Sequence, residues 1–188
     1  MKKGMIGKSK DAVVHSAKWR LWKWRDPNPK VVAAISAFMQ QGHTIEECIA
    51  QFGVQPEFTE WEGNVALNEG LANVVELICG ISTPAKWDAA NARLGVGNSS
   101  TAANSAQTAL LGASKTFKAM VATYPQRSGQ TAIWRSQFDS AEANYAWEEY
   151  TVVNAADDTG QNLNRKVEPK GTKASGETWT LELQIAFS

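Results

Sequence analysis

The sequence is poor in the residues that most often build catalytic and metal sites. Its 188 residues include two histidines and two cysteines, and their positions give no zinc-ligand spacing. Cys48 follows His43 by five residues, but it falls on the apolar stripe of an expected helix, which favours a buried thiol over a nucleophile. We therefore expect a protein that is not an enzyme and needs no cofactor or metal.

Long hydrophobic runs are also missing. No stretch of about 18 apolar residues occurs, and the basic start MKKGMIGKSK is followed by no apolar run of signal-peptide length. The formal net charge is zero, so there is no bulk attraction for nucleic acid or an anionic membrane. We expect a protein made in a cytosol with both cysteines reduced, no membrane partner, and nucleic acid disfavoured as a partner.

Three short patterns resemble parts of catalytic or ligand-binding sites, but none of them meets the requirements of such a site. Gly95-Val96-Gly97-Asn98 lacks the third glycine or the Gly-Lys-Ser/Thr of a phosphate loop, so it predicts a tight turn leaving a strand. Glu148 and Glu149 are adjacent on an expected strand and point to opposite faces. Asp157-Asp158-Thr159-Gly160 lacks the later ligands of a calcium loop and predicts a hairpin turn.

The composition is sufficient for a hydrophobic core. With 43% hydrophobic residues, the chain is long enough to bury one domain with an appendage. We divide it into a flexible basic arm over 1–18, a strand with helices over 19–80, and an antiparallel β-domain over 81–188.

Apolar residues recur at helical spacing in three places before residue 81. Asn28 and Pro29 begin a helix over 28–41, and Thr44 with Glu47 forms a capping box for a second helix that ends at Gly53. A third helix ends at Gly80, with an apolar stripe that we expect to face the core. This stripe consists of Leu67, Leu71, Val74, Val75 and Ile78.

Strands are expected before and after these helices, at 19–25, around 57–62, and in six later segments. The later segments are 92–96, 116–124, 130–138, 145–154, 162–169 and 177–187. The last alternates most clearly, with Trp179, Leu183 and Ile185 on its buried face and a wet opposite face. The expected fold is α+β, mainly β: an antiparallel β-sandwich or barrel-like C-terminal region with an N-terminal strand and two to three short helices.

Charge is unevenly distributed. Residues 1–25 carry eight Lys and Arg residues against a single aspartate, whereas residues 44–76 carry seven glutamates and no Lys or Arg. Either these are two solvated faces, or the arm of one subunit docks on the acidic face of another. In the second case the arm would act through its lysines and its few apolar residues, and a neighbouring chain would hold it in place. These candidate residues are Lys2, Lys3, Met5, Ile6, Lys8, Lys10, Val13 and Val14.

A second candidate interaction site is the aromatic and basic strand formed by Trp19, Arg20, Trp22, Lys23, Trp24 and Arg25. The tryptophans could stack on bases or sugars. The alternative, which we favour, places the aromatic residues on one core-facing side and the cations on a solvated side.

The chain from Glu62 onward resembles structural proteins of tailed-bacteriophage virions, including the attachment domains of some tail fibres. The resemblance covers about two thirds of the chain and is carried by Glu62-Gly63-Asn64, Leu67-Asn68-Glu69-Gly70, the run from Asn91 to Ala102, Gln107-Thr108-Ala109-Leu110, Ala141-Glu142-Ala143-Asn144, Trp147-Glu148-Glu149, Leu163-Asn164-Arg165-Lys166 and Gly171-Thr172-Lys173. Because the sequence ends with the domain, we expect no fibre shaft or receptor-binding tip.

This resemblance implies a non-catalytic virion protein, with a capsid decoration (cement) protein ranked first. Such a protein would be assembled in the host cytoplasm and lie on the particle surface. Its partners would be the major capsid protein or other virion subunits, including copies of itself in a homo-oligomer. The alternatives are a tail, baseplate or fibre adaptor, and a carbohydrate- or nucleic-acid-binding module that uses the tryptophan-rich strand.

Overall fold

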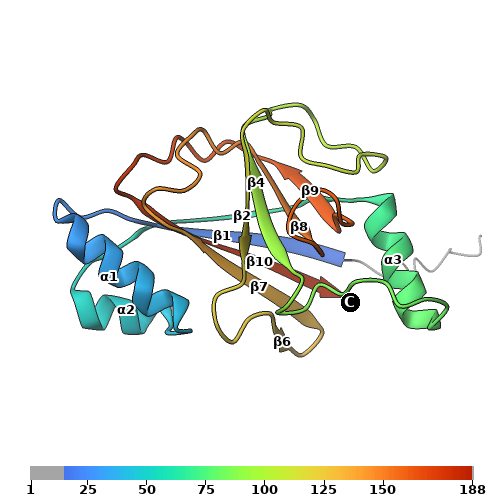
Figure 1. Cartoon of the computed structure of the whole chain (residues 1–188), viewed down its shortest axis with the longest axis horizontal. Coiled ribbons are helices and arrows are strands. Elements are labelled where there is room, and N and C mark those ends of the chain that lie inside the picture. The colour runs from blue at the N-terminus through green and yellow to red at the C-terminus, as the bar shows by residue number, and fades with distance from the viewer. Residues whose placement is uncertain (1–14, 188) are drawn as a thin grey trace, which may run out of the picture.

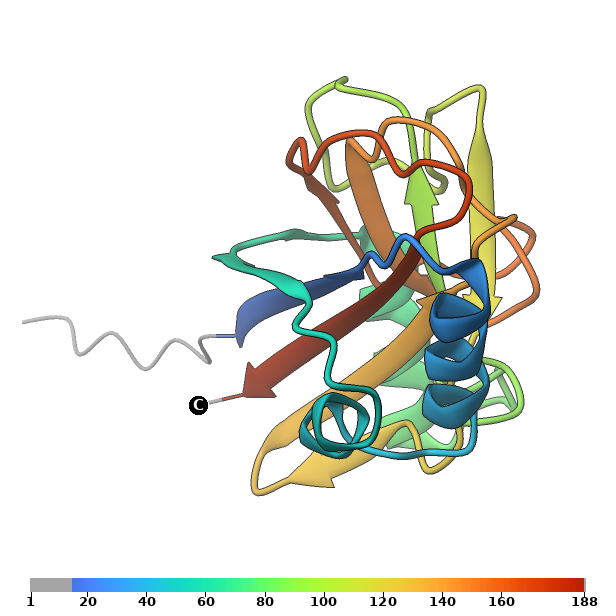
Figure 2. The same ribbon diagram turned by 90° about the vertical axis from the view of Figure 1, so that its left-hand side faces the viewer.

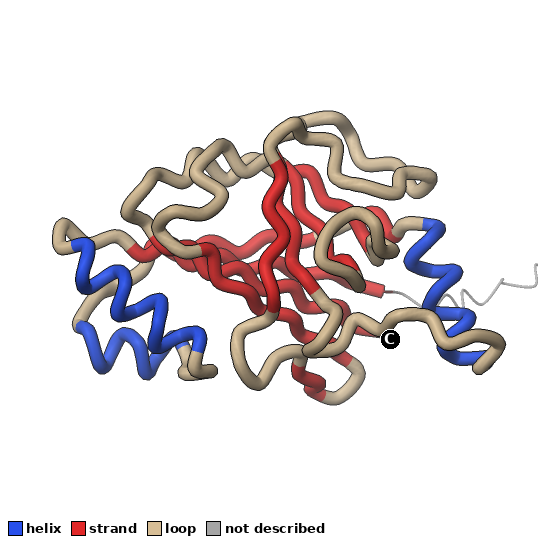
Figure 3. Tube along the Cα trace, in the orientation of Figure 1, coloured by secondary structure: helices blue, strands red, loops and turns tan. Residues whose placement is uncertain are grey.

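The computed structural model describes residues 15–187. Two antiparallel five-stranded sheets form its centre, with helices α1 (Pro29–Gln40) and α2 (Ile45–Phe52) at one end and α3 (Asn68–Cys79) at the other (Figure 1). The expected class, α+β and mainly β, is confirmed. The strands occupy the middle of the molecule, as the colouring by secondary structure makes plain (Figure 3).

The first sheet has the order β2-β1-β10-β7-β6 and the second the order β3-β9-β8-β4-β5. The first is built from β1 (His15–Trp24), β2 (Glu57–Glu62), β6 (Gln126–Ser128), β7 (Thr131–Phe138) and β10 (Thr178–Phe187). The second is built from β3 (Val65–Ala66), β4 (Arg93–Gly97), β5 (Lys115–Ala119), β8 (Glu149–Val153) and β9 (Asn164–Val167). Strands of the second sheet cross over those of the first (Figures 1 and 2).

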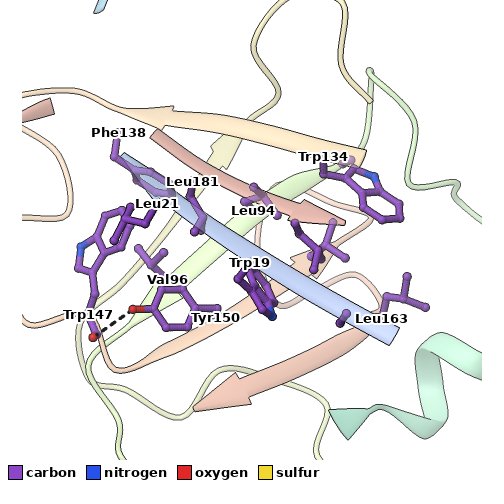
Figure 4. Packing of buried hydrophobic residues seen from close by; sticks show 14 of the residues in the cluster. Trp19, Leu21, Leu94, Val96, Trp134, Phe138, Trp147, Tyr150, Leu163 and Leu181 are labelled. Atoms are coloured by element: carbon purple, nitrogen blue, oxygen red, sulfur yellow. Dashed lines mark hydrogen bonds between the residues drawn. The ribbon is translucent and has the colours of Figure 1, made fainter. Parts of the chain in front are cut away.

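The main core lies between the two sheets, because β1, β7 and β10 of the first sheet and β4 and β8 of the second turn alternate apolar residues toward the other sheet. The pairing of Trp19 with Leu183 and of Leu183 with Trp134 keeps these side chains on one face. From the second sheet, Leu94 and Tyr150 meet them, and Trp19 lies 5.6 Å from Tyr150 between ring centroids (Figure 4).

A smaller core lies on the opposite face of the first sheet, under α1 and α2. Asn28 caps α1 through the Lys30 amide, and the Thr44–Glu47 capping box begins α2, so both expected helix starts are confirmed. Ile35, Met39 and Cys48 are buried there against Trp24. At its Trp24 end, the face of β1 that points away from the second sheet is therefore covered as well.

The packing of α1 and α2 on the first sheet corrects the expectation for β10, the last strand. Trp179, Leu183 and Ile185 are buried as predicted, but Thr180 and Glu182 on the other face are buried too. The alternation in the sequence predicts that this face is exposed to solvent. Instead, its polar residues form hydrogen bonds and ion pairs with neighbours, including residues of β7.

Several expected boundaries differ. The strand expected over 116–124 ends at Ala119, the one over 145–154 is confined to Glu149–Val153, and the short strands β3 and β6 had not been expected. Residues 15–18 belong to β1 rather than preceding it, and both sheets combine strands from the ranges 19–80 and 81–188. The two ranges thus share one pair of sheets.

Candidate interaction surfaces

The tryptophans of β1 do not form one platform. Trp19 points into the main core and Trp24 into the smaller one, and both are completely buried. Only Trp22 is partly exposed, beside Phe58 at 5.3 Å between ring centroids. The expectation that the aromatic residues share a face was wrong, because positions 19 and 22 differ by an odd number of residues on a strand.

The cations of β1 are neutralised within the chain. Arg20 pairs with Glu60 at 2.8 Å, Lys23 pairs with Glu57 at 2.8 Å, and Arg25 pairs with Glu57 and Glu177. Lys23 is also buried, with its ammonium 4.7 Å from the centroid of the Trp179 ring. The basic strand therefore offers no net positive surface, and the expected solvated face of cations is wrong for Lys23.

These ion pairs come from the strand pairing of β1 with β2, which places Arg20 opposite Glu60 and Lys23 opposite Glu57. The hydrogen bond from Arg20 lowers the pKa of Glu60, and the hydrogen bond from Lys23 lowers that of Glu57. Part of the charge asymmetry seen in the sequence is thus satisfied inside one subunit.

A row of charges continues across the first sheet from β1. Glu182 on β10 is almost completely buried and lies between Arg20 and Arg135. The Arg135 guanidinium lies 4.6 Å from the ring centroid of Tyr124 and 5.4 Å from that of Trp22. With its charge paired and its faces covered by aromatic rings, Arg135 is held as a structural residue.

The glycines that suggested a turn have a different role. Gly95 and Gly97 lie within β4, and a Cβ on Gly97 would come within 2.4 Å of Oε1 of Glu149. The predicted turn at this point was wrong. The glycines leave room for the buried Glu149 carboxylate and, at Gly95, for the Phe117 ring.

Glu149 anchors the long segment between β4 and β5. Its carboxylate accepts hydrogen bonds from the amides of Leu111 (3.0 Å) and Gly112 (2.6 Å), and it pairs with Arg165 Nη2 at 2.7 Å. Arg165 also donates to Gln107 at 3.0 Å. Glu149 and Arg165 are both fully buried, so this pair fixes the segment from inside and is closed to solvent.

The apolar face of α3 is the largest departure from the sequence prediction. Leu67 is buried and Val74 is partly buried, but Leu71, Val75 and Ile78 are exposed by 46%, 55% and 78%. The helix turns Gly70 and Asn73 toward the protein instead. A Cβ on Gly70 would lie 2.5 Å from Cα of Leu163, so this side of α3 packs directly against backbone.

An apolar groove adjoins the exposed stripe. It has a volume of about 230 Å³ and is lined mainly by Leu71, Val74, Leu163, Ile185 and Phe187. We call the stripe Leu71, Val75 and Ile78 together with this groove the α3 groove. The apolar spacing of these residues predicts a helix that faces the core, whereas the packing of Gly70 against Leu163 leaves the apolar side of α3 free.

A second, polar hollow of about 570 Å³ lies on another side of α3, between the 84–85 segment and the 154–161 turn. Glu69, Asn73 and Glu76 line it, and burial raises the pKa of Glu69, whose carboxylate accepts from the Asn162 amide at 2.6 Å. Oδ1 of Asn73 is buried without a hydrogen-bond partner. The hollow is wide and open, and none of its lining residues is basic.

Within residues 15–187, no cluster of three or more His, Cys, Asp or Glu is arranged to hold a metal ion, and no helix has the length and hydrophobicity to cross a membrane. The candidate arm residues Lys2, Lys3, Met5, Ile6, Lys8, Lys10, Val13 and Val14 lie outside the described residues. No protein-family model, curated protein or solved structure matches the chain.

Proposed function

We propose that the chain is a non-catalytic structural protein of a virus particle, a capsid decoration protein that binds the assembled shell through its surface and its N-terminal arm. The observation that carries this proposal is the α3 groove. Exposed contiguous apolar surface on a well-packed protein marks a site for another protein. Leu71, Val75 and Ile78 form such a surface on one helix.

The rest of the surface chemistry supports a protein partner over a base or a sugar. Trp19 and Trp24 are buried and Arg20 is paired, so the strand that suggested ligand stacking retains only Trp22 as a partly exposed tryptophan. The particular partner, a capsid shell, comes from the resemblance of residues 62 onward to tailed-bacteriophage virion proteins.

The proposal is tested by adding the purified chain to undecorated capsids and measuring the protein that sediments with them. We expect saturable binding, weakened by removing residues 1–12 and, in part, by raising the salt concentration, because screening weakens charge complementarity between exposed groups. Binding to isolated tails but not to capsids would favour the tail-adaptor alternative. Binding to neither would overturn the virion assignment.

A further inference from the structure

The polar hollow beside α3 receives three side chains from one face of that helix. Glu69, Asn73 and Glu76 are spaced by four and three residues, so they lie on the same side of α3, and all three line the hollow. Residues of the 84–85 segment and of the 154–161 turn complete its lining. The hollow shares no lining residue with the groove beside the apolar stripe, so α3 carries two separate surfaces.

Asn73 brings an unsatisfied hydrogen-bond acceptor to this hollow. Its Nδ2 donates to the Ala85 carbonyl at 2.9 Å, whereas its Oδ1 is buried and has no hydrogen-bond partner among the described residues. The residue as a whole is 4% exposed. Because a buried acceptor without a donor destabilises the folded chain, a ligand that donates a hydrogen bond here gains free energy that water in the bulk cannot offer to the same extent.

The two glutamates add negative charge that the chain does not neutralise. Glu69 accepts from the Asn162 amide at 2.6 Å and Glu76 from the Ser82 hydroxyl at 2.8 Å, and both donors are uncharged. In the described part of the chain, no Lys or Arg forms an ion pair with either carboxylate. Burial raises the pKa of Glu69, and the nearby charge of Asp158 raises it further, so a cation would stabilise this carboxylate.

The arrangement suits an organic cation better than a metal ion. Among residues 15–187, no three His, Cys, Asp or Glu side chains are placed to hold a metal, and calcium takes about six to eight oxygen ligands. The volume of about 570 Å³ falls within the range of small-ligand pockets, about 300–1,000 Å³. Ala72, Pro84 and Ala155 supply apolar lining that the carbon chain of an alkylammonium can cover.

A lysine-type ammonium also fits better than a guanidinium. An ammonium is a compact charge with three N–H donors and no acceptor, and it can turn its donors toward separate oxygens. The planar guanidinium fork pairs best with the two oxygens of a single carboxylate. The hollow offers acceptors on three different side chains instead.

We propose that the polar hollow binds the ammonium group of a lysine side chain from a partner protein, with Glu69 and Glu76 as carboxylate partners and Oδ1 of Asn73 as the neutral acceptor. This site goes beyond the proposed decoration function. It lies on a different side of α3 from the α3 groove, and its test requires no capsid.

The test measures the binding of a lysine model compound to the ¹⁵N-labelled full-length chain by NMR titration. The probe is Nα-acetyl-lysine methylamide, and its Nε-acetylated form keeps the carbon chain but lacks the charge. Glu69→Gln and Glu76→Gln remove the two carboxylates. The matched control is Glu46→Gln, which removes an exposed glutamate from α2 at the opposite end of the molecule (Figure 1).

We expect saturable shifts that are largest for the amides around the hollow, such as those of Gly160 and Gln161. Glu69→Gln and Glu76→Gln should each weaken binding about tenfold, because each removes a charge-assisted hydrogen bond. Glu46→Gln should bind as the wild type does, and the acetylated probe should not bind. Glu76 is exposed, so Glu76→Gln leaves the test decisive even if Glu69→Gln is poorly folded.

Four results would overturn the proposal. These are the absence of binding at the hollow, binding of the acetylated probe as tight as that of the charged one, equal weakening by Glu46→Gln and Glu76→Gln, and an unchanged affinity in Glu76→Gln. Calcium chloride is titrated in parallel. Calcium that displaces the lysine compound and itself binds more weakly to Glu76→Gln would make the hollow a metal site, and would refute the assignment to lysine.

Discussion

Replacing Glu149 by glutamine should be among the most destabilising isosteric changes in the protein. The carboxylate holds Arg165 through Nε at 2.8 Å and Nη2 at 2.7 Å, and it accepts from two backbone amides of the segment between β4 and β5. Glutamine keeps the shape but removes the charge, and its amide group must face at least one donor. Removing one partner of a buried pair costs about 3–5 kcal/mol, because the other charge is left uncompensated.

Urea unfolding of Glu149→Gln should therefore give a free energy of unfolding about 3–5 kcal/mol below that of the wild type with an unchanged m-value. For a protein of this size the melting temperature should fall by about 6–20 °C, at about 2–4 °C per kcal/mol. The matched control is Glu168→Gln, whose carboxylate is 38% exposed and, within the described part of the chain, pairs with Lys166 and Lys170 alone. That change should stay within about 0.5 kcal/mol.

A double variant distinguishes charge from packing. Adding Arg165→Met to Glu149→Gln removes the uncompensated guanidinium, so the double variant should be less destabilised than the sum of the two single variants. A loss below about 1 kcal/mol in Glu149→Gln, or strict additivity in the double variant, would refute the view that this buried pair anchors the segment.

Three further outcomes follow from the described contacts. Burial lowers the pKa of Lys173 to about 8, below its value in the unfolded chain. Because the native lysine loses its proton first, the free energy of unfolding should rise between about pH 8 and 10.5. Urea titrations at several pH values should show this rise in the wild type and not in Lys173→Met. One thiol, Cys79, should react rapidly in the native protein and a second, Cys48, only after denaturation; two fast thiols by mass spectrometry would contradict the burial of Cys48. Gly70→Ala should destabilise the protein by about 1–3 kcal/mol in thermal unfolding, because the added Cβ would meet the Leu163 backbone. This loss should occur although alanine is the better helix former. A stabilised variant would show that α3 can move away from Leu163.

Local signals in the sequence predicted the helices well. Asn28 before Pro29, the Thr44–Glu47 capping box and Gly80 are each sufficient to place a helix end, because they satisfy backbone groups within a few residues. The buried face of β10 was also predictable from alternation.

Features that depend on residues distant in the sequence could not be predicted from local sequence patterns. The role of Gly97 depends on Glu149 in another strand, and the burial of Lys23 depends on Trp179. The orientation of α3 depends on Gly70, where the lack of a side chain allows the backbone to approach Leu163. An apolar stripe predicts a helix, but it does not say whether that stripe faces the core or a partner.

The number of copies of the chain that bind per capsid is the sharpest test of the decoration proposal. The purified protein is mixed with undecorated capsids over a range of concentrations, and the sedimented complexes are quantified. We expect saturation at a fixed number of copies that matches the symmetry of the shell, as for a specific site on each capsid unit. Protein that stays in the supernatant at every concentration, or that binds without saturating, would contradict it.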